Sequence, residues 1–263
     1  VNNFETLDGN LGPGNLNAWT CMGRAVALAR ENGIGVVSLR NTNHWIRAGT
    51  YGLQSAKEHC IGICMTNTTP NVTPCGCREA TVGNNPMAIA VPHEPYPVLL
   101  DMAMSQFSYG KMEVTEKLGQ KLPFPGGFDS DLRLTDEPAA ILESGLAMPM
   151  GQWKGSALAI MIDLLVSVLS GGSTTREIGS RDDEYAVSQL FAAFDLGRLT
   201  DARKRATAIA DVIESLRQTR PAEEGGLASY PGQRTWMRRQ ENLEKGIPID
   251  PDTWEDILAL EQE

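Results

Sequence analysis

The segment that most restricts the fold is residues 153–172, with the sequence WKGSALAIMIDLLVSVLSGG. Its apolar residues recur at helical spacing, for example at Ile162 and Leu165, and also occupy much of the opposite side. This pattern predicts a helix that is buried nearly all round. Its longest apolar run, 157–169, is interrupted by Asp163 and is too short to cross a bilayer. We therefore expect this helix to lie inside a large protein core, with no membrane.

The rest of the chain interleaves short strand patterns with amphipathic helices, without repeats or low-complexity linkers. Strands are predicted at 34–40, 61–68, 87–92, 97–103 and 188–196, and helices at 15–32, 49–60, 104–118, 201–219 and 251–263. In the last of these, Asp250 is the expected N-cap and Pro251 the first helical residue. The fold class is therefore mixed α/β. A central region, 55–200, holds the strands, and the flanks, 1–54 and 201–263, are mainly helical.

The charge balance excludes several classes of partner. Asp and Glu number 33 against 23 Lys and Arg, which gives a net charge of -10. Such a surface repels nucleic acid phosphates and anionic membranes. The opening residues, VNNFETLDGN, have neither the basic start nor the apolar stretch of a signal peptide. We expect a cytoplasmic protein.

The chain has five cysteines, and we expect all of them to be reduced thiols. A zinc site built from Cys60, Cys64, Cys75 and Cys77 is conceivable. However, two ligands separated by one residue do not match the usual spacing of structural zinc sites. We expect no metal.

One carboxylate occupies an unusual place. Residues 99–111, LLDMAMSQFSYGK, end an apolar strand in Asp101 before the next predicted helix. A carboxylate there does not stabilise a protein core, but it can accept hydrogen bonds from a bound ligand. The chain has no Walker loop, and GNLGPG at 9–14 has the wrong glycine spacing for a Rossmann fingerprint. Any dinucleotide must therefore bind in another way.

Seven segments in the same order resemble the malate/L-lactate dehydrogenase family that lacks a Rossmann fold. They are NTNHWIRAGTYG (41–52), IGICMTNT (61–68), GNNPMAIAVP (83–92), LLDMAMSQFSYGK (99–111), MPMGQWKGSALAIMIDLL (148–165), DEYAVSQLF (183–191) and YPGQRTW (230–236). The resemblance covers nearly the whole chain. Within the family it is nearest to members that reduce a sugar-derived keto acid, 2,3-diketo-L-gulonate.

The resemblance implies that 55–200 is a non-Rossmann nucleotide-binding domain with a mixed sheet. It also implies a homodimer that reduces a 2-keto acid by hydride transfer from NADH, with NADPH as the other possible donor. The cofactor residues that carry over are Pro97, Val98, Leu99, Leu100, Asp101, Met102, Ala103, Trp153, Lys154, Gly232, Gln233 and Arg234. Gln233 and Arg234 differ from the family pattern.

Two of these residues have clear chemical roles in this reading. Asp101 would accept hydrogen bonds from ribose hydroxyls, and Lys154 would pair with a phosphate. The plainer alternatives are a solvated or helix-capping aspartate and a surface lysine.

The reaction also needs a proton donor and a cation for the substrate carboxylate. Of the three histidines, His44 follows a predicted strand beside Arg47, which makes it the candidate catalytic residue and Arg47 the candidate substrate ligand. His59 and His93 are expected to be structural or surface residues. The family's N-terminal Ser-His-Gly motif is absent from this sequence. An alternative is therefore a truncated, non-catalytic remnant that keeps the nucleotide site. Another is a malate-, lactate- or ureidoglycolate-type dehydrogenase of the same family.

Overall fold

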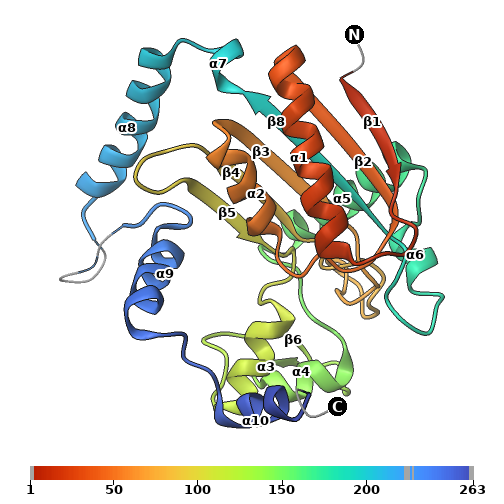
Figure 1. Cartoon of the computed structure of the whole chain (residues 1–263). Coiled ribbons are helices and arrows are strands. Elements are labelled where there is room, and N and C mark those ends of the chain that lie inside the picture. Colours follow the sequence, from red (N-terminus) through yellow and green to blue (C-terminus); the bar gives the residue numbers. More distant parts are fainter. Residues whose placement is uncertain (1–2, 222–225, 227, 261–263) are drawn as a thin grey trace.

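The computed structural model describes residues 3–221, 226 and 228–260 (Figure 1). Its centre is a six-stranded sheet in the order β1 (Phe4–Asp8), β2 (Ile34–Thr42), β8 (Val187–Asp195), β3 (Cys60–Thr66), β4 (Met87–Val91) and β5 (Val98–Met102). Strand β1 is parallel to β2, and the other neighbouring pairs of this sheet are antiparallel. The expected mixed α/β class is confirmed.

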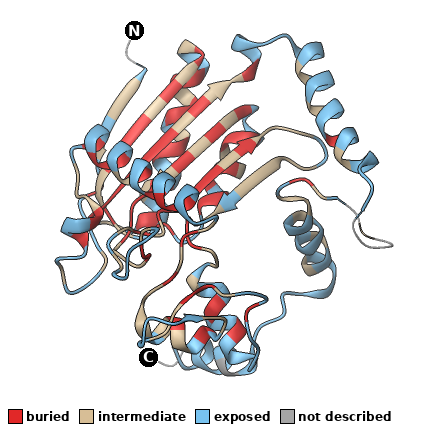
Figure 2. Cartoon of the chain, turned by 180° about the vertical axis from the view of Figure 1, so that it is seen from behind, coloured by how far each residue is buried: buried red, intermediate tan, exposed pale blue. Residues whose placement is uncertain are grey.

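Helices cover both faces of this sheet. On one face lie α1 (Gly14–Asn32) and α2 (Ala48–Lys57), which share a buried core with Leu39 and Phe191 of the strands. On the other face lies α5 (Trp153–Ser170), which packs with Leu190 and the partly buried Val36. Alternate residues of β2 and β8 therefore serve opposite cores, as the two-residue period of a strand requires. Figure 2, drawn from the α5 side, shows the inner strands largely buried.

The expectation that α5 is buried nearly all round is wrong. Its buried face consists mostly of small residues: Gly155, Ser156, Ala159, Ser167 and Ser170, with Ile162 and Val166. These let the helix approach the sheet closely, while Met161, Leu164 and Val168 remain 51%, 49% and 73% exposed. Among the described residues, α5 is the one helix that is long and apolar enough to cross a membrane, by length and composition alone. The sheet covers one face of it, and the opposite apolar face stays exposed.

A smaller unit lies beyond the end of β5. It contains α3 (Tyr109–Lys117), β6 (Gly127–Phe128), β7 (Leu134–Thr135) and α4 (Pro138–Ser144). Its core gathers Val72, Met112, Leu122, Ile141 and Ala147. Because Val72 belongs to the long β3–β4 connection, this loop joins the smaller unit to the sheet.

The C-terminal part is helical. After β8 it comprises the short α7 (Leu196–Leu199), then α8 (Ala202–Gln218), α9 (Gln233–Lys245) and α10 (Pro251–Leu260). One further short helix, α6 (Thr175–Ile178), precedes β8. The expected cap of α10 is confirmed, because the Thr253 amide donates to Asp250 Oδ1 at 3.1 Å. In α8, Ile213 is the one buried residue, Ile209 and Leu216 are half-buried, and Val212 is exposed.

The longer predicted elements appear close to their expected places. Several elements were not predicted, because they are short or strongly polar: β1, β6, β7, α4, α6, α7 and α9. The sheet also takes β1 and β2 from residues 1–54, a part that the sequence predicted as mainly helical. The division into a helical part and a central nucleotide-binding domain stays a prediction.

Candidate active site

Strand β5 forms one edge of the sheet, and two other segments meet its ends. Near its start, the Leu99 amide donates to the Pro231 carbonyl at 2.9 Å, which docks the turn before α9. Just past its end, the Met150 amide donates to the Met104 carbonyl at 2.8 Å, which docks the start of α5. Of the three segments predicted to hold the cofactor, 97–103 forms β5, and 232–234 and 153–154 follow the two docked segments at its opposite ends.

The side chains of Leu99 and Asp101 point from β5 toward α2, where two glycines face them. A Cβ added at Gly49 would lie 2.5 Å from Asp101 Oδ2, and one at Gly52 would lie 3.0 Å from Leu99 Cδ1. The glycines that weaken this helix as an isolated segment therefore create the space for Asp101. The Asp101 side chain is 24% exposed, so its carboxylate can still meet a ligand.

Arg47 and Asp101 form an ion pair, with Arg47 Nε 3.1 Å from Asp101 Oδ2. The sequence assigned these residues to different partners, a substrate and a cofactor. Their contact makes them neighbours in one site. Because half of the Arg47 side chain is exposed, the pair stays open to solvent.

Trp153 and Lys154 open α5 and are both exposed. Their position is fixed by Gly155, where a Cβ would lie 2.9 Å from the Met104 carbonyl oxygen and 2.4 Å from that of Met150. A cation in the first turn of a helix is disfavoured by the helix dipole, by roughly 0.3–1 kcal/mol. A bound anion would remove that penalty, so Lys154 suits a phosphate-binding position.

Gly232 precedes α9 with a φ of +89°, a conformation that favours glycine. A Cβ there would lie 3.0–3.1 Å from Leu99 atoms. Beside it is a cavity of about 120 Å³, lined by Arg47, Gly49, Thr50, Leu53, Pro97, Leu99, Gly232, Thr235, Trp236 and Arg239. Sequence reasoning missed Leu53, Trp236 and Arg239 here, because nothing in the sequence shows that α2 and α9 face each other across β5. Of the predicted cofactor residues, Pro97, Leu99 and Gly232 line this cavity. The others do not, among them Asp101, Trp153, Lys154, Gln233 and Arg234.

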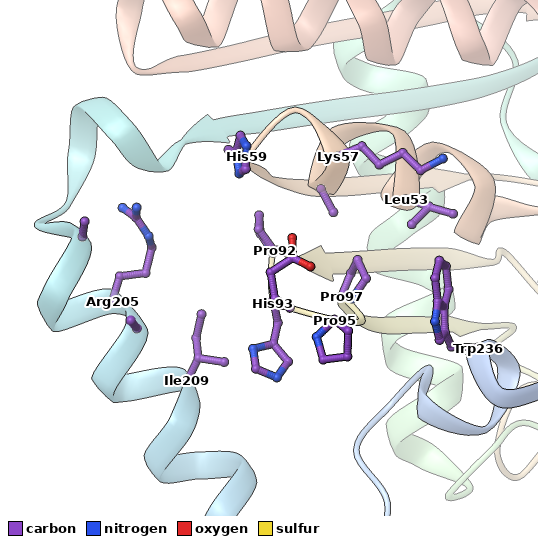
Figure 3. Close-up of a pocket in the computed structure, with 14 residues that line it drawn as sticks. Leu53, Lys57, His59, Pro92, His93, Pro95, Pro97, Arg205, Ile209 and Trp236 are labelled. Carbon is purple, nitrogen blue, oxygen red and sulfur yellow. The ribbon is translucent and has the colours of Figure 1, made fainter. Parts of the chain in front are cut away.

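A larger cavity of about 640 Å³ adjoins the smaller one, because Leu53, Pro97 and Trp236 line both (Figure 3). Its walls come from the end of α2, the β4–β5 connection, α8 and α9. His59 and His93 line it. The His93 ring packs edge-on against Tyr230, with ring centroids 6.0 Å apart. The two cavities are therefore neighbours near the start of β5.

His44 lies in the connection between β2 and α2, with its side chain exposed. The Ile46 amide donates to His44 Nδ1 at 3.1 Å, so a neutral imidazole carries its proton on Nε2. The connection is held by Trp45, which is 1% exposed and whose carbonyl accepts from Tyr51 Oη at 2.6 Å. Among the described residues, the hydrogen-bond partner of the His44 side chain is the Ile46 amide of the same loop. Arg47, which follows His44 by three residues, pairs with Asp101.

All five cysteines are free thiols. Within the part of the chain that the structure describes, no cluster of three or more His, Cys, Asp or Glu side chains has the arrangement of a metal site.

The fold is shared with a class of dehydrogenases of known structure. A malate dehydrogenase structure from Entamoeba histolytica superposes with a TM-score of 0.92 at 25% identity, covering 100% of this chain and 77% of that one. Malate dehydrogenase from Pyrococcus horikoshii OT3 superposes with a TM-score of 0.87 at 29% identity, over 100% and 74% of the two chains.

The sequence places the chain more narrowly. The family model described as malate/L-lactate dehydrogenase matches residues 2–258, and the chain belongs to this family. It is 41% identical to a 2,3-diketo-L-gulonate reductase from Klebsiella oxytoca, over 98% of this chain and 77% of that protein. A reductase of the same name from Citrobacter koseri is 40% identical over the same shares. The chain is therefore an oxidoreductase of this family.

Proposed function

We propose that this protein binds NADH along β5 and uses it to reduce a 2-keto acid, with 2,3-diketo-L-gulonate as the first substrate to test. The proposal rests on β5 itself and on the docking of two other predicted cofactor segments at its ends, through the contacts of Leu99 with Pro231 and of Met104 with Met150. The names of the curated relatives support the choice of substrate. NADPH is the alternative cofactor, and malate- or lactate-type keto acids are the alternative substrates. We further propose that the protein acts in the cytoplasm.

The residues at this edge suit a dinucleotide. Asp101 offers carboxylate oxygens for ribose hydroxyls in a space that Gly49 keeps open. Lys154 offers an exposed ammonium for a phosphate. At the far end of β5, Gly232 and Trp236 border a cavity with apolar walls from Leu53 and Pro97, which would accept a flat base.

When bound, the reduced nicotinamide would supply the hydride. The chain must then hold the substrate and provide a proton for the alkoxide that forms at the former ketone carbon. Arg47 is our candidate for the substrate carboxylate, because its guanidinium bonds Asp101 through Nε and has two further nitrogens. His44 is our candidate proton donor through Nε2.

Titration of NADH and NADPH into the protein, followed by tryptophan fluorescence, tests the cofactor assignment. Loss of absorbance by the reduced nucleotide with 2,3-diketo-L-gulonate, oxaloacetate or pyruvate then tests the reaction. We expect NADH to bind and 2,3-diketo-L-gulonate to be consumed fastest. Binding without turnover of any keto acid would instead support a non-catalytic remnant, and failure of both nucleotides to bind would refute the proposal.

A His44→Ala variant with unchanged turnover would remove His44 from the mechanism.

A Gly49→Ala variant tests whether the space beside Asp101 matters for cofactor binding. The added methyl group would lie 2.5 Å from Asp101 Oδ2 and must displace that carboxylate. We expect the Kd for NADH to rise about tenfold, equivalent to about 1.4 kcal/mol. Gly110→Ala is the matched control, because Gly110 is also helical and a Cβ there meets nothing within 4 Å. Equal Kd values in the two variants would count against Asp101 as a cofactor ligand.

We also propose that the protein is a homodimer whose two copies meet through the exposed face of α5. Trp153, Ile160, Met161, Leu164, Leu165 and Val168 line this face, each between 40% and 73% exposed. Apolar side chains repeated along a whole helix exceed the scattered apolar exposure of ordinary surfaces. A twofold axis would pair this face with itself and bury it on both copies.

A Val168→Asp variant tests this interface. Val168 is 73% exposed, so the change should leave the monomer's fold intact while placing two buried carboxylates in the dimer. We expect wild-type protein to sediment as a dimer and this variant as a monomer in analytical ultracentrifugation. Val212→Asp on α8, at a position 63% exposed, is the control and should stay dimeric. A monomeric wild type, or a dimeric Val168→Asp variant, would contradict the interface.

A further inference from the structure

Two of the five thiols differ from the others. Cys21, Cys60 and Cys64 are buried. Burial raises the pKa of the Cys21 thiol to about 12 and that of Cys60 to about 11, and it also raises the pKa of Cys64. Because the thiolate is the reacting form, these three are inert at neutral pH. Cys75 and Cys77 are exposed, in the long connection between β3 and β4.

These two thiols share one tight turn. The Cys77 amide donates to the Pro74 carbonyl at 2.9 Å, which closes a β-turn over residues 74–77. Gly76 has a φ of +83°, as the third residue of a type II turn requires. Two Cα atoms separated by one residue lie at most about 7 Å apart in an extended chain. Because the chain bends at Gly76, we expect the Cα atoms of Cys75 and Cys77 to lie closer than this limit, and disulfides span Cα separations of roughly 4.4–6.8 Å.

The turn is anchored on both sides. The Thr73 amide donates to the Ala147 carbonyl at 2.9 Å, and the Cys75 amide donates to Ser156 Oγ at 3.3 Å. Both cysteines line a cavity of about 150 Å³, which Thr73, Phe128 and Met148 also line. Thr73 is 1% exposed, and among the described residues its hydroxyl has no hydrogen-bond partner. The two thiols are therefore held on an anchored turn, next to a cavity that also exposes the unpaired Thr73 hydroxyl. This arrangement suits reaction with a small molecule.

We propose that Cys75 and Cys77 form a thiol–disulfide pair that reacts with low-molecular-weight disulfides such as glutathione disulfide. One protein thiolate attacks the glutathione disulfide, which releases one glutathione thiolate and leaves a mixed disulfide on the protein. The second protein thiolate then attacks the protein sulfur of that mixed disulfide and releases the other glutathione. Two electrons pass from the protein to glutathione, and the two protons lost by the protein thiols are available to the glutathione thiolates.

The ring that forms spans a single intervening residue. Short rings strain the disulfide, and strained, exposed disulfides are the easily reduced ones. We therefore expect the pair to close with an oxidised glutathione pool and to reopen readily with a reduced one. This behaviour differs from that of a permanent structural disulfide, and it does not depend on the proposed cofactor or substrate.

Intact-mass spectrometry of the folded protein after incubation with glutathione disulfide tests the proposal. Wild-type protein should lose the mass of two hydrogens and carry no glutathione, and peptide mapping should join Cys75 to Cys77. In Cys75→Ser or Cys77→Ser the second step is blocked, so each variant should retain one glutathione. Both positions are exposed, so these variants should fold, which circular dichroism verifies. A stable glutathione adduct on wild type, a disulfide between two protein molecules, or no reaction would overturn the proposal.

Discussion

Replacing Asp101 with alanine is expected to weaken NADH binding about 10- to 100-fold. A hydrogen bond to a charged group contributes roughly 1.5–3 kcal/mol, and each 1.4 kcal/mol changes an affinity tenfold. The change would also remove the ion pair between Arg47 and Asp101. Because this pair is open to solvent on the Arg47 side, its loss should cost little stability. Fluorescence titration gives the Kd, and thermal unfolding shows whether the fold is retained.

The chain supplies a close control for this variant. Arg40 Nε lies 3.1 Å from Asp8 Oδ2, the same atoms and distance as in the pair of Arg47 and Asp101. Asp8 ends β1, at the opposite edge of the sheet from β5. Asp8→Ala therefore removes an equivalent surface ion pair and should leave the Kd for NADH unchanged. If both variants bind NADH as the wild type does, Asp101 is a solvated aspartate and the site must be sought elsewhere.

The largest effect on stability is expected from Phe191→Ala. Phe191 is 0% exposed in the central strand β8. Its ring meets those of Trp45 and Tyr51 edge-on, at centroid distances of 5.9 and 6.1 Å. Truncating a fully buried phenylalanine typically costs about 3–5 kcal/mol, because transfer energy is lost and a cavity remains. Equilibrium unfolding in urea measures this loss.

Phe124→Ala removes the same side chain from a different setting. Phe124 is 48% exposed and packs on Phe107 at a centroid distance of 4.9 Å. Because about half of its surface already meets water, we expect a loss of about 1 kcal/mol or less. Equal losses in the two variants would mean that the cluster of Trp45, Tyr51 and Phe191 does not support the core as described.

Local periodicity was sufficient to predict the main elements of the fold, and it failed where a tertiary contact decides. The pattern of α5 shows apolar residues on most sides, but it cannot show that the sheet covers only one of them. The small residues Gly155, Ser156 and Ala159 were the available signal, since a helix that packs closely on a sheet needs them. In the same way, Gly49 and Gly52 indicate a weak helix until the strand that they face is known.

The candidate site was predictable only in part. Asp101, Lys154 and Gly232 were identified through the family resemblance, and the structure places their segments around one strand. The cavity walls from Leu53 and Trp236 could not be predicted, because they are ordinary helix residues from distant parts of the chain. The contact between Arg47 and Asp101 was equally hidden, since 54 positions separate the two residues.

The position of β8 has a consequence for how the protein is made. This strand pairs with both β2 and β3, yet it follows them by a long stretch of chain that lies between Thr66 and Val187. During synthesis on the ribosome, the edges of β2 and β3 that pair with β8 stay unpaired until β8 emerges. Such distant pairing slows folding, because loop-closure entropy is lost before the contacts form. A nascent chain that stops before β8 would lack the middle of its sheet, and we expect it to depend on chaperones or to aggregate.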